Sequence, residues 1–379
     1  MYSPEYMERL TRMRNAIKFQ HNDRIPTLSS ANGWMAYDSG LRVRDAYYDY
    51  KVAREVVKQF VERYQFDSYI YTYTVHNLAA TRALGGGSYH LDPKTDALYA
   101  TDHTYLYPEE YGEYAKDPMK YLRKCFARKY PDMTTQKFAN ALQEFLNFSQ
   151  WGMQCDKMMR EELKTTQMNS MASSCMSPLE LLNASLRGMK DVAIDMRRHK
   201  GALKEYLDAT WEKMLLPGVQ GVMAAPSNDD FVVDVYIAML AHSFLNVRQF
   251  EELYWPYMKK VLDMAVANNK TVYIFCENSM MRFKEFFQDI PKGTVVMHLE
   301  DDNIREVRRE LPNLALAGGM PLEHLGYGTP EQCVDDAKRL IDDLGEGYIL
   351  SMTKNAAYKD DMKRENLLAV MEFCREYKL

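Results

Sequence analysis

The 379-residue sequence lacks several signals that mark large classes of proteins. It has no apolar run near the roughly 18 residues that a membrane-spanning helix needs. The formal net charge is −5, and no stripe of Lys and Arg runs along the chain, which argues against nucleic-acid binding. We therefore expect neither a membrane span nor a nucleic-acid partner.

Cysteines are few and scattered along the chain. They contain no Cys-x-x-Cys pair, the spacing typical of zinc and redox motifs. No secretory signal is recognisable either. We therefore expect a reduced, cytoplasmic protein. The cysteines are Cys125, Cys155, Cys175, Cys276, Cys333 and Cys374.

The longest glycine run, Gly85–Gly87, is not followed by Lys-Ser or Lys-Thr, so we reject a phosphate-binding loop. The glycines and the turn residues at 92–96 predict irregular structure or a hairpin. Methionine and tyrosine, by contrast, are plentiful, with 26 and 27 residues. Both suit a deformable pocket around an aromatic ligand, although a compositional bias of the lineage explains the same counts.

The last third of the chain alternates strand-like and helix-like segments. Its predicted strands are 271–278, 294–300, 313–319 and 347–352. Helix-start signals stand at Ser3, Ser177 and Thr329, each followed by proline. Repeated βα units imply a parallel sheet, and about seven or eight units fit the chain. We predict one (β/α)8 TIM barrel over 1–379, with a mostly helical excursion at about 108–216.

Two of the predicted strands end in side chains that can bind a metal. The first ends in Cys276 and Glu277, and the second in His298 and Glu300. Twenty residues separate Glu277 from His298, the length of a βαβ crossover. Parallel strands end on one rim, where α/β enzymes keep their chemistry, so we predict these two as neighbouring catalytic residues and metal ligands. The alternative is a surface glutamate and a core histidine.

A catalytic zinc generally has three protein ligands, and the sequence leaves the third open. His242 ends an apolar stretch before a long predicted helix, and Asp230 lies in a strand-end loop. Cys276 is a third candidate, although it should point away from Glu277 because neighbouring strand side chains alternate. We take His242 as the first choice.

Aromatic side chains near the ends of the first two predicted strands are candidates for substrate binding. Trp34 follows the first strand, and Tyr71, Tyr73 and His76 lie near the end of the second. On a barrel they would face the same rim as Glu277. We predict that they form walls around an aromatic ring.

Four segments together carry a family resemblance. An aromatic-Pro motif lies in 248–263, before the predicted metal strand. Gly-Gly-x-Pro, Gly-Thr-Pro-Glu and an acidic helix follow in 314–342. Segments 345–351 and 364–377 complete the pattern as a penultimate strand and a closing helix that begins at Glu-Asn. From about residue 177 to its end, the chain resembles the uroporphyrinogen decarboxylase superfamily, whose members are (β/α)8 barrels.

Motifs within this superfamily separate its branches. True decarboxylases carry Arg-Gln-Ala-Gly-Arg to grip substrate carboxylates, whereas residues 27–40 here read TLSSANGWMAYDSG. Methyltransferases with a His-x-Cys zinc motif differ too, because Phe275 and Glu277 stand at those positions. The chain resembles most the methyltransferases that act on methyl ethers, in which a Glu and a His are thought to bind zinc. The matching pieces are Phe275–Glu277, Pro291–Gly293 and His298–Glu300.

This resemblance implies a zinc-dependent methyltransferase. It would move a methyl group from a small O-methylated compound, such as an aromatic methyl ether, to the cobalt of a corrinoid carried by a partner protein. Zinc would stabilise the leaving oxygen as a Lewis acid, and oxygen and nitrogen ligands suit that task. Asn278 replaces the family's usual Gly after Glu277, and we count it among the substrate-binding candidates. The alternatives are a decarboxylase-like enzyme of other chemistry and a metal-free binding barrel.

Overall fold

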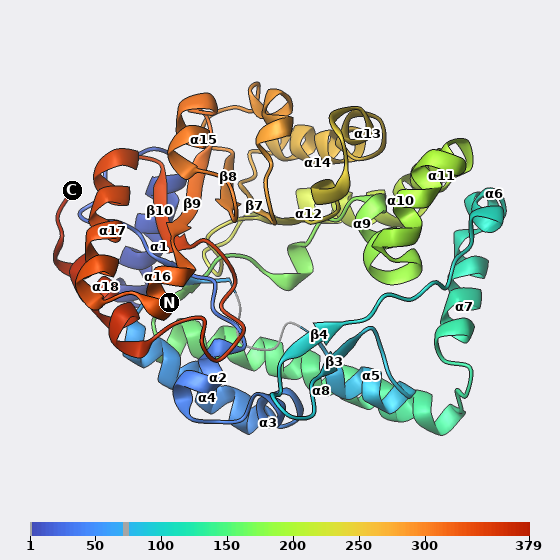
Figure 1. The fold of residues 1–379 in the computed structure, drawn as a ribbon, viewed down its shortest axis with the longest axis horizontal. Helices are drawn as coiled ribbons and strands as arrows, with labels where there is room; N and C mark the ends of the chain where they lie inside the picture. Colours follow the sequence, from blue (N-terminus) through green and yellow to red (C-terminus); the bar gives the residue numbers. More distant parts are fainter. Residues whose placement is uncertain (1, 71–75) are drawn as a thin grey trace.

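A ring of parallel strands forms the centre of the computed structural model, which describes residues 2–70 and 76–379 (Figure 1). Within these residues a five-stranded sheet has the order β10-β9-β8-β7-β6 and a three-stranded sheet the order β1-β2-β5. The strands are β1 (Leu28–Ser29), β2 (Ser68–Tyr69), β5 (Thr166–Gln167), β6 (Val235–Met239), β7 (Val272–Cys276), β8 (Val295–Leu299), β9 (Ala315–Met320) and β10 (Tyr348–Met352).

Backbone hydrogen bonds join the two sheets at both edges and so close the ring. The Leu350 N–H donates to the Pro26 carbonyl over 2.9 Å, which links β10 to β1. The Val232 N–H donates to the Gln167 carbonyl over 3.0 Å, which links β5 to the segment before β6. The eight strands thus run parallel around one barrel, and the predicted (β/α)8 architecture is confirmed.

Helix α1 (Pro4–Ile17) packs against the inward-facing side chains of the barrel. The Ser3 side chain accepts the Tyr6 N–H and caps the helix, as its sequence predicts. Tyr6, Leu10 and Met13 are fully buried with alternate residues of the strands, among them Tyr273. Side chains of the other strand face join a second, larger core against the outer helices.

The outer helices follow the strands in sequence. Near the N-terminus lie α2 (Trp34–Ser39), α3 (Val43–Tyr48) and α4 (Tyr50–Tyr64). The last third contains α13 (Val247–Leu253), α14 (Trp255–Ala267), α15 (Ile304–Glu310), α16 (Leu322–Tyr327), α17 (Pro330–Leu344) and α18 (Arg364–Glu376). A 3-10 helix over Met281–Phe287, rather than an α-helix, joins β7 to β8. None of the helices in the described residues combines the length and the apolar character needed to span a membrane.

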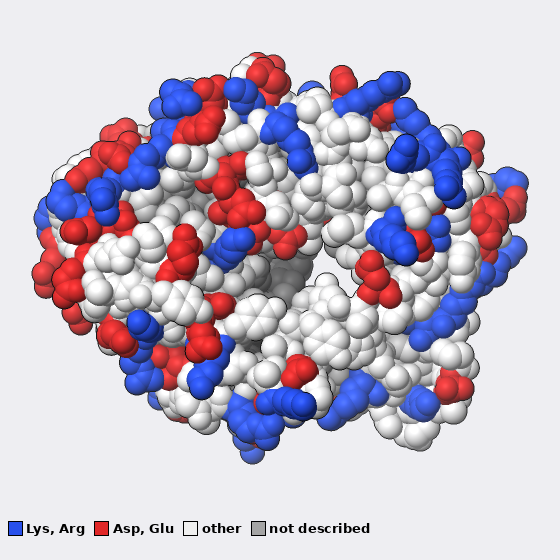
Figure 2. Space-filling model, in the orientation of Figure 1, with Lys and Arg blue, Asp and Glu red and all other residues white. Residues whose placement is uncertain are grey.

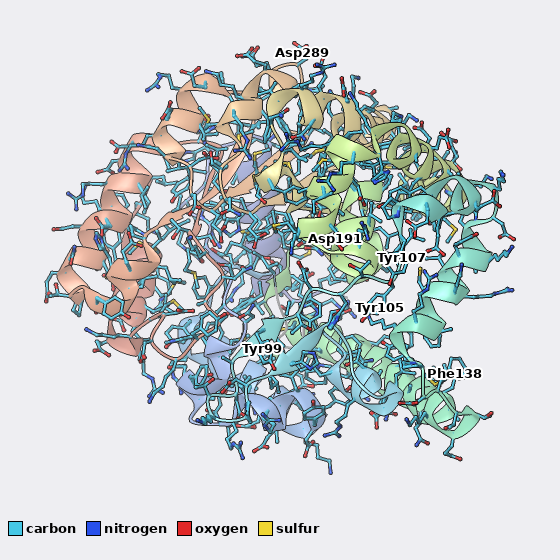
Figure 3. All side chains as sticks on the ribbon, turned by 45° about the vertical axis from the view of Figure 1, so that its right-hand side comes forward. Tyr99, Tyr105, Tyr107, Phe138, Asp191 and Asp289 are labelled. Atoms are coloured by element: carbon cyan, nitrogen blue, oxygen red, sulfur yellow. The ribbon has the colours of Figure 1, made fainter. Side chains whose placement is uncertain are left out.

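Strand β5 divides residues 78–224, a segment that contains the predicted helical excursion at about 108–216, into two parts. Before it come α5 (Leu78–Leu84), the antiparallel hairpin β3 (Tyr89–Leu91) and β4 (Leu98–Ala100), α6 (Tyr111–Lys116), α7 (Pro118–Lys129) and α8 (Thr135–Lys157). After it come α9 (Pro178–Leu181), α10 (Met189–Arg198), α11 (Lys200–Thr210) and α12 (Leu216–Ala224). Of the two alternatives predicted for this segment, irregular structure or a hairpin, the structure has the hairpin. The face in Figure 2 is hollowed at its centre, between the barrel and these additions, and Figure 3 shows Phe138 of α8 at the outer edge.

A buried carboxylate, Asp67, joins α1 to the starts of the first two strands. Its side chain is fully buried and accepts hydrogen bonds of 2.8 Å from both Arg12 and Arg24. It also accepts the Thr27 N–H over 3.0 Å. The charge is therefore paired on several sides, which offsets the cost of removing it from water.

Replacing Asp67 by Ala should destabilise the protein by about 3–5 kcal/mol, because it leaves two largely buried guanidinium groups short of their partner. Urea denaturation followed by circular dichroism measures the change. Asp342→Ala is the matched control, since this carboxylate pairs with Lys338 on the exposed face of α17, and its effect should be much smaller. Equal midpoints for the two variants would contradict the role of Asp67.

Candidate active site at the barrel rim

Glu277 lies at the carboxyl end of β7, on the rim of the barrel. Tyr273 and Phe275 of this strand point into the barrel and pack with α1, whereas Cys276 belongs to the core facing the helices. Glu277 continues the inward series, because strand side chains alternate. Its N–H donates to the Met239 carbonyl over 3.2 Å, which holds the residue against the end of β6.

The surroundings of Glu277 favour its protonated form. Burial raises the pKa of its carboxyl, and the negative charge of Glu300 raises it further. Lys354 opposes this shift, but its ammonium is engaged by Asp301 over 2.9 Å. A carboxyl group with a raised pKa at a strand end can serve as a general acid.

Asn278 positions the carboxylate of Glu300 beside Glu277. Its φ of 57° lies in the left-handed region, which Asn tolerates better than most residues and which explains a usual Gly here. The Asn278 N–H donates to Glu300 Oε2 over 2.7 Å. The backbone of Asn278 thus makes a contact beside Glu277. The role of its side chain in substrate binding stays a prediction.

His298 is fully buried inside the barrel, and both of its ring nitrogens have partners. Nε2 lies 2.9 Å from the Met352 carbonyl, and Nδ1 lies 2.7 Å from the Tyr273 hydroxyl. A carbonyl only accepts, so Nε2 carries the hydrogen and Nδ1 accepts from the tyrosine. Burial lowers the pKa of His298 to about 4, so the ring is neutral at pH 7.

The three predicted zinc ligands do not come together. Glu277 and His298 end neighbouring strands, as predicted, but the nitrogens of His298 are directed to other partners. His242 lies on the helix-facing side of β7, where its Nε2 is 3.5 Å from Cys276 Sγ. Across residues 2–70 and 76–379, no group of three His, Cys, Asp or Glu side chains converges on a common point. The predicted set therefore does not fit a zinc ion in this arrangement.

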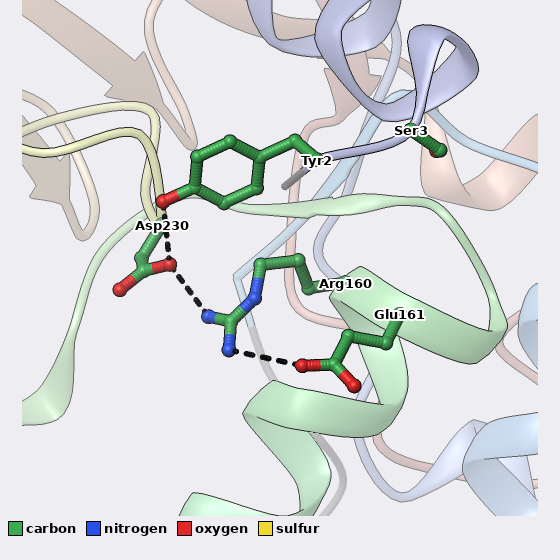
Figure 4. Close-up of a pocket in the computed structure, with 5 residues that line it drawn as sticks. All are labelled: Tyr2, Ser3, Arg160, Glu161 and Asp230. Carbon is green, nitrogen blue, oxygen red and sulfur yellow. Dashed lines mark hydrogen bonds and ion pairs between the residues drawn. The ribbon is translucent and has the colours of Figure 1, made fainter.

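Asp230, the other candidate for a third ligand, lies at the opposite end of the barrel. It precedes β6 and accepts hydrogen bonds from Tyr2 over 3.0 Å and from Arg160 over 2.6 Å (Figure 4). These side chains, with Ser3 and Glu161, line a cavity of about 590 Å³ beside α1. Asp230 is thus part of an ion-pair network at the amino-terminal end and cannot meet Glu277.

The aromatic residues predicted to line the substrate pocket have three different outcomes in the structure. The prediction that Trp34 lines the substrate pocket is wrong. Its indole packs on Phe60 and Tyr64 in the core, and its Nε1 donates to the Met362 carbonyl over 3.0 Å. Tyr71 and Tyr73 lie outside the described residues. Only His76 of the predicted set can be placed in the aromatic surroundings of the rim.

His76 stacks on Tyr89 of the β3–β4 hairpin, with ring centroids 3.6 Å apart. Burial lowers the pKa of His76 to about 4, so an uncharged ring faces the tyrosine. Burial and the charge of Glu277 raise the pKa of Tyr89, whose hydroxyl is therefore within electrostatic reach of Glu277. Sequence reasoning missed Tyr89, because only the hairpin turn signalled its segment and nothing tied it to β7.

Glu180 is a second residue that the sequence did not reveal. It is buried on α9, and its Oε1 accepts the N–H groups of Leu240 and Ala241 and the Tyr254 hydroxyl, each over 2.8 Å. Burial is the main cause that raises its pKa to about 7. Glu180 thereby fixes the backbone that follows β6, next to the rim.

The comparisons with known proteins agree with this architecture. The model of the uroporphyrinogen decarboxylase family matches residues 153–377. The chain belongs to this family. Among solved structures, a methyltransferase from Methanosarcina mazei superposes with a TM-score of 0.66, covering 97% of this chain and 98% of that chain at 14% sequence identity. At that identity the likeness concerns the fold, and no curated protein matches the chain by sequence.

Lowering the pH from 7 to 5 should destabilise this family member through His298. An unfolded histidine has a pKa of about 6.5, and folded His298 has one of about 4. Between these values only the unfolded state binds the proton, so stability falls as the pH falls. His298 should lower the free energy of unfolding by about 2 kcal/mol between pH 7 and pH 5. Urea denaturation at both pH values measures this change.

His298→Gln should lose this share of the pH dependence, because glutamine can bridge the same partners without titrating. His21→Gln, at an exposed position, is the control and should keep the wild-type dependence. An unchanged pH dependence in His298→Gln would contradict a neutral histidine held inside the barrel.

Proposed function

We propose that this protein is a methyltransferase that takes a methyl group from a small O-methylated compound and passes it to a corrinoid carried by a partner protein. Glu277 would supply the proton that the leaving oxygen needs. The observation that carries the proposal is the Glu277 carboxyl itself, which lies at the catalytic rim of the fold with a raised pKa.

The proposed reaction balances with one proton. The carbon–oxygen bond of the methyl compound breaks, its electron pair stays on oxygen, and that oxygen takes the proton of Glu277. The reduced corrinoid of the partner would supply the electron pair that accepts the methyl group. A methyl ether is inert because its leaving oxygen is strongly basic, so a positioned acid can lower the barrier substantially.

Neighbouring residues support this role for Glu277. Burial and the charge of Glu300 raise the pKa of Glu277, and the Asn278 N–H donates a hydrogen bond to Glu300. Tyr89 and His76 add a stacked, uncharged aromatic pair from the hairpin side. Such a pair suits an aromatic methyl ether, which is the substrate class that we propose first.

Zinc as the Lewis acid, predicted from the sequence, stays a prediction. It would require His298 to release one of its two partners, the Tyr273 hydroxyl or the Met352 carbonyl, so that one ring nitrogen could bind the ion. We therefore derive no step through a metal and assign the stabilisation of the leaving oxygen to Glu277.

A decarboxylase of other chemistry is the second candidate, and family membership is the observation that favours it. A protonated Glu277 could equally give its proton to the carbanion that loss of carbon dioxide leaves. Uroporphyrinogen itself is a poor fit as the substrate, because residues 27–40 lack the paired arginines that would grip its carboxylates. Incubation with uroporphyrinogen should therefore yield no coproporphyrinogen.

Glu277→Gln should reduce methyl transfer about 10²–10⁴-fold, because the amide keeps the shape and cannot donate the proton as an acid. Transfer from a panel of aromatic methyl ethers to cob(I)alamin, followed by absorbance, measures the rate. In the wild type the rate should fall as the pH rises through the pKa of Glu277, since the protonated form is the active one. Glu277→Gln should lack that fall.

Glu161→Gln, at the opposite end of the barrel, is the matched control and should retain the wild-type rate. Full activity of Glu277→Gln would contradict the proposal. Loss of wild-type activity on treatment with a chelator, restored by zinc alone, would favour the zinc-dependent form of the reaction.

A further inference from the structure

Helix α8 presents an apolar stripe to solvent. Phe138, Leu142, Phe145, Leu146 and Met153 are exposed by 51%, 51%, 57%, 54% and 67%. At 3.6 residues per turn, these positions and Ser149 fall within a stripe about 100° wide. The opposite side of the helix is already packed, with Trp151 and Cys155 buried. The stripe is therefore a second apolar face that nothing in the chain covers among the described residues.

Charge is nearly absent from this surface. Every residue of α8 is described, and among its exposed residues only Lys157, at the C-terminal end, is charged. In the whole sequence 27% of residues are charged. Flanking positions carry neutral polar side chains such as Gln143 and Gln150. Depletion of charge around an apolar centre is typical of the core of a protein–protein interface.

We infer that two copies of this chain pair through α8, in an antiparallel contact about a two-fold axis between Phe145 and Leu146. This axis places Phe138 against Met153 of the second copy and Leu142 against Ser149. Phe145 then meets Leu146 at the centre. An isologous contact requires such a self-complementary order, because each pair occurs twice.

The charged residues near the stripe also fit this axis. It places Glu144 opposite Asn147 of the second copy, Lys137 opposite Gln154, and Lys157 opposite Thr134. No charged side chain of α8 meets its like. A charged partner could not recognise this uncharged face by electrostatic complementarity, whereas a second, identical helix can pack on it.

The area agrees with a stable dimer. Large apolar side chains carry about 150–250 Å² each, so five that are half exposed offer about 500 Å². An interface that is about 60% apolar then covers about 800 Å² per copy, the usual size for a specific contact. Helix α8 is about 34 Å long, and Figure 3 shows Phe138, near its start, at the outer edge of the molecule.

Sedimentation equilibrium on the full chain at micromolar concentration tests the inference. The wild type should have twice the mass of the 44.2 kDa chain, and Phe145→Glu should have the mass of one chain. Val247→Glu, an exposed apolar position on α13, is the matched control and should stay dimeric. A monomeric wild type, or a dimeric Phe145→Glu, would overturn the inference.

The register has its own test. Phe138→Lys and Met153→Glu should each weaken the dimer, and the double variant should restore it, because the axis pairs the new charges. Failure of the double variant to recover would overturn this axis. Cross-linking of Phe145→Cys with a bifunctional thiol reagent tests the pairing without placing a charge on the stripe. All six native cysteines are buried, so the expected product is one cross-linked dimer, and its absence would also overturn the pairing.

Discussion

Side chains leave strand β7 alternately on its two faces, and this alternation decides which groups of the protein can act together. Tyr273, Phe275 and Glu277 form one series toward the barrel axis, whereas Cys276 faces the helices and contacts His242. Because the barrel is closed, a group on one face cannot reach the other without disrupting the strand. The groups that can act at the rim are thus the inward-facing side chains, such as Glu277, and the side chains of the β3–β4 hairpin opposite them.

The same constraint explains why His298 and Glu277 have different roles. His298 lies one layer deeper, where burial keeps it neutral and a hydroxyl and a carbonyl occupy its two nitrogens. It joins β7, β8 and β10 across the barrel interior. Glu277 lies at the edge of that interior, where burial and the charge of Glu300 raise the pKa of its carboxyl. The buried layer that contains His298 thus lies next to Glu277 at the rim.

Much of the fold could be predicted from the sequence, because strand and helix periods, proline starts and turn residues are local signals. The βα alternation after β6 and the rim position of Glu277 follow from them. The partners of His298 could not be predicted, since they depend on packing between three strands. Trp34 was misplaced because short helix α2 turns its indole into the core. Tyr89 was missed because its proximity to Glu277 depends on how an inserted hairpin folds back over the barrel.

His298 is neutral and is held by Tyr273 and Met352, so Glu277 is the group that we propose to act at the rim. Nitrogen NMR of protein labelled with ¹⁵N-histidine, recorded at pH 7 with and without added zinc, tests it most directly. The expected result is a protonated Nε2 and an unprotonated, hydrogen-bonded Nδ1, with both signals unchanged by zinc. A charged ring, the opposite tautomer, or a shift of either nitrogen to a metal-bound position would contradict it.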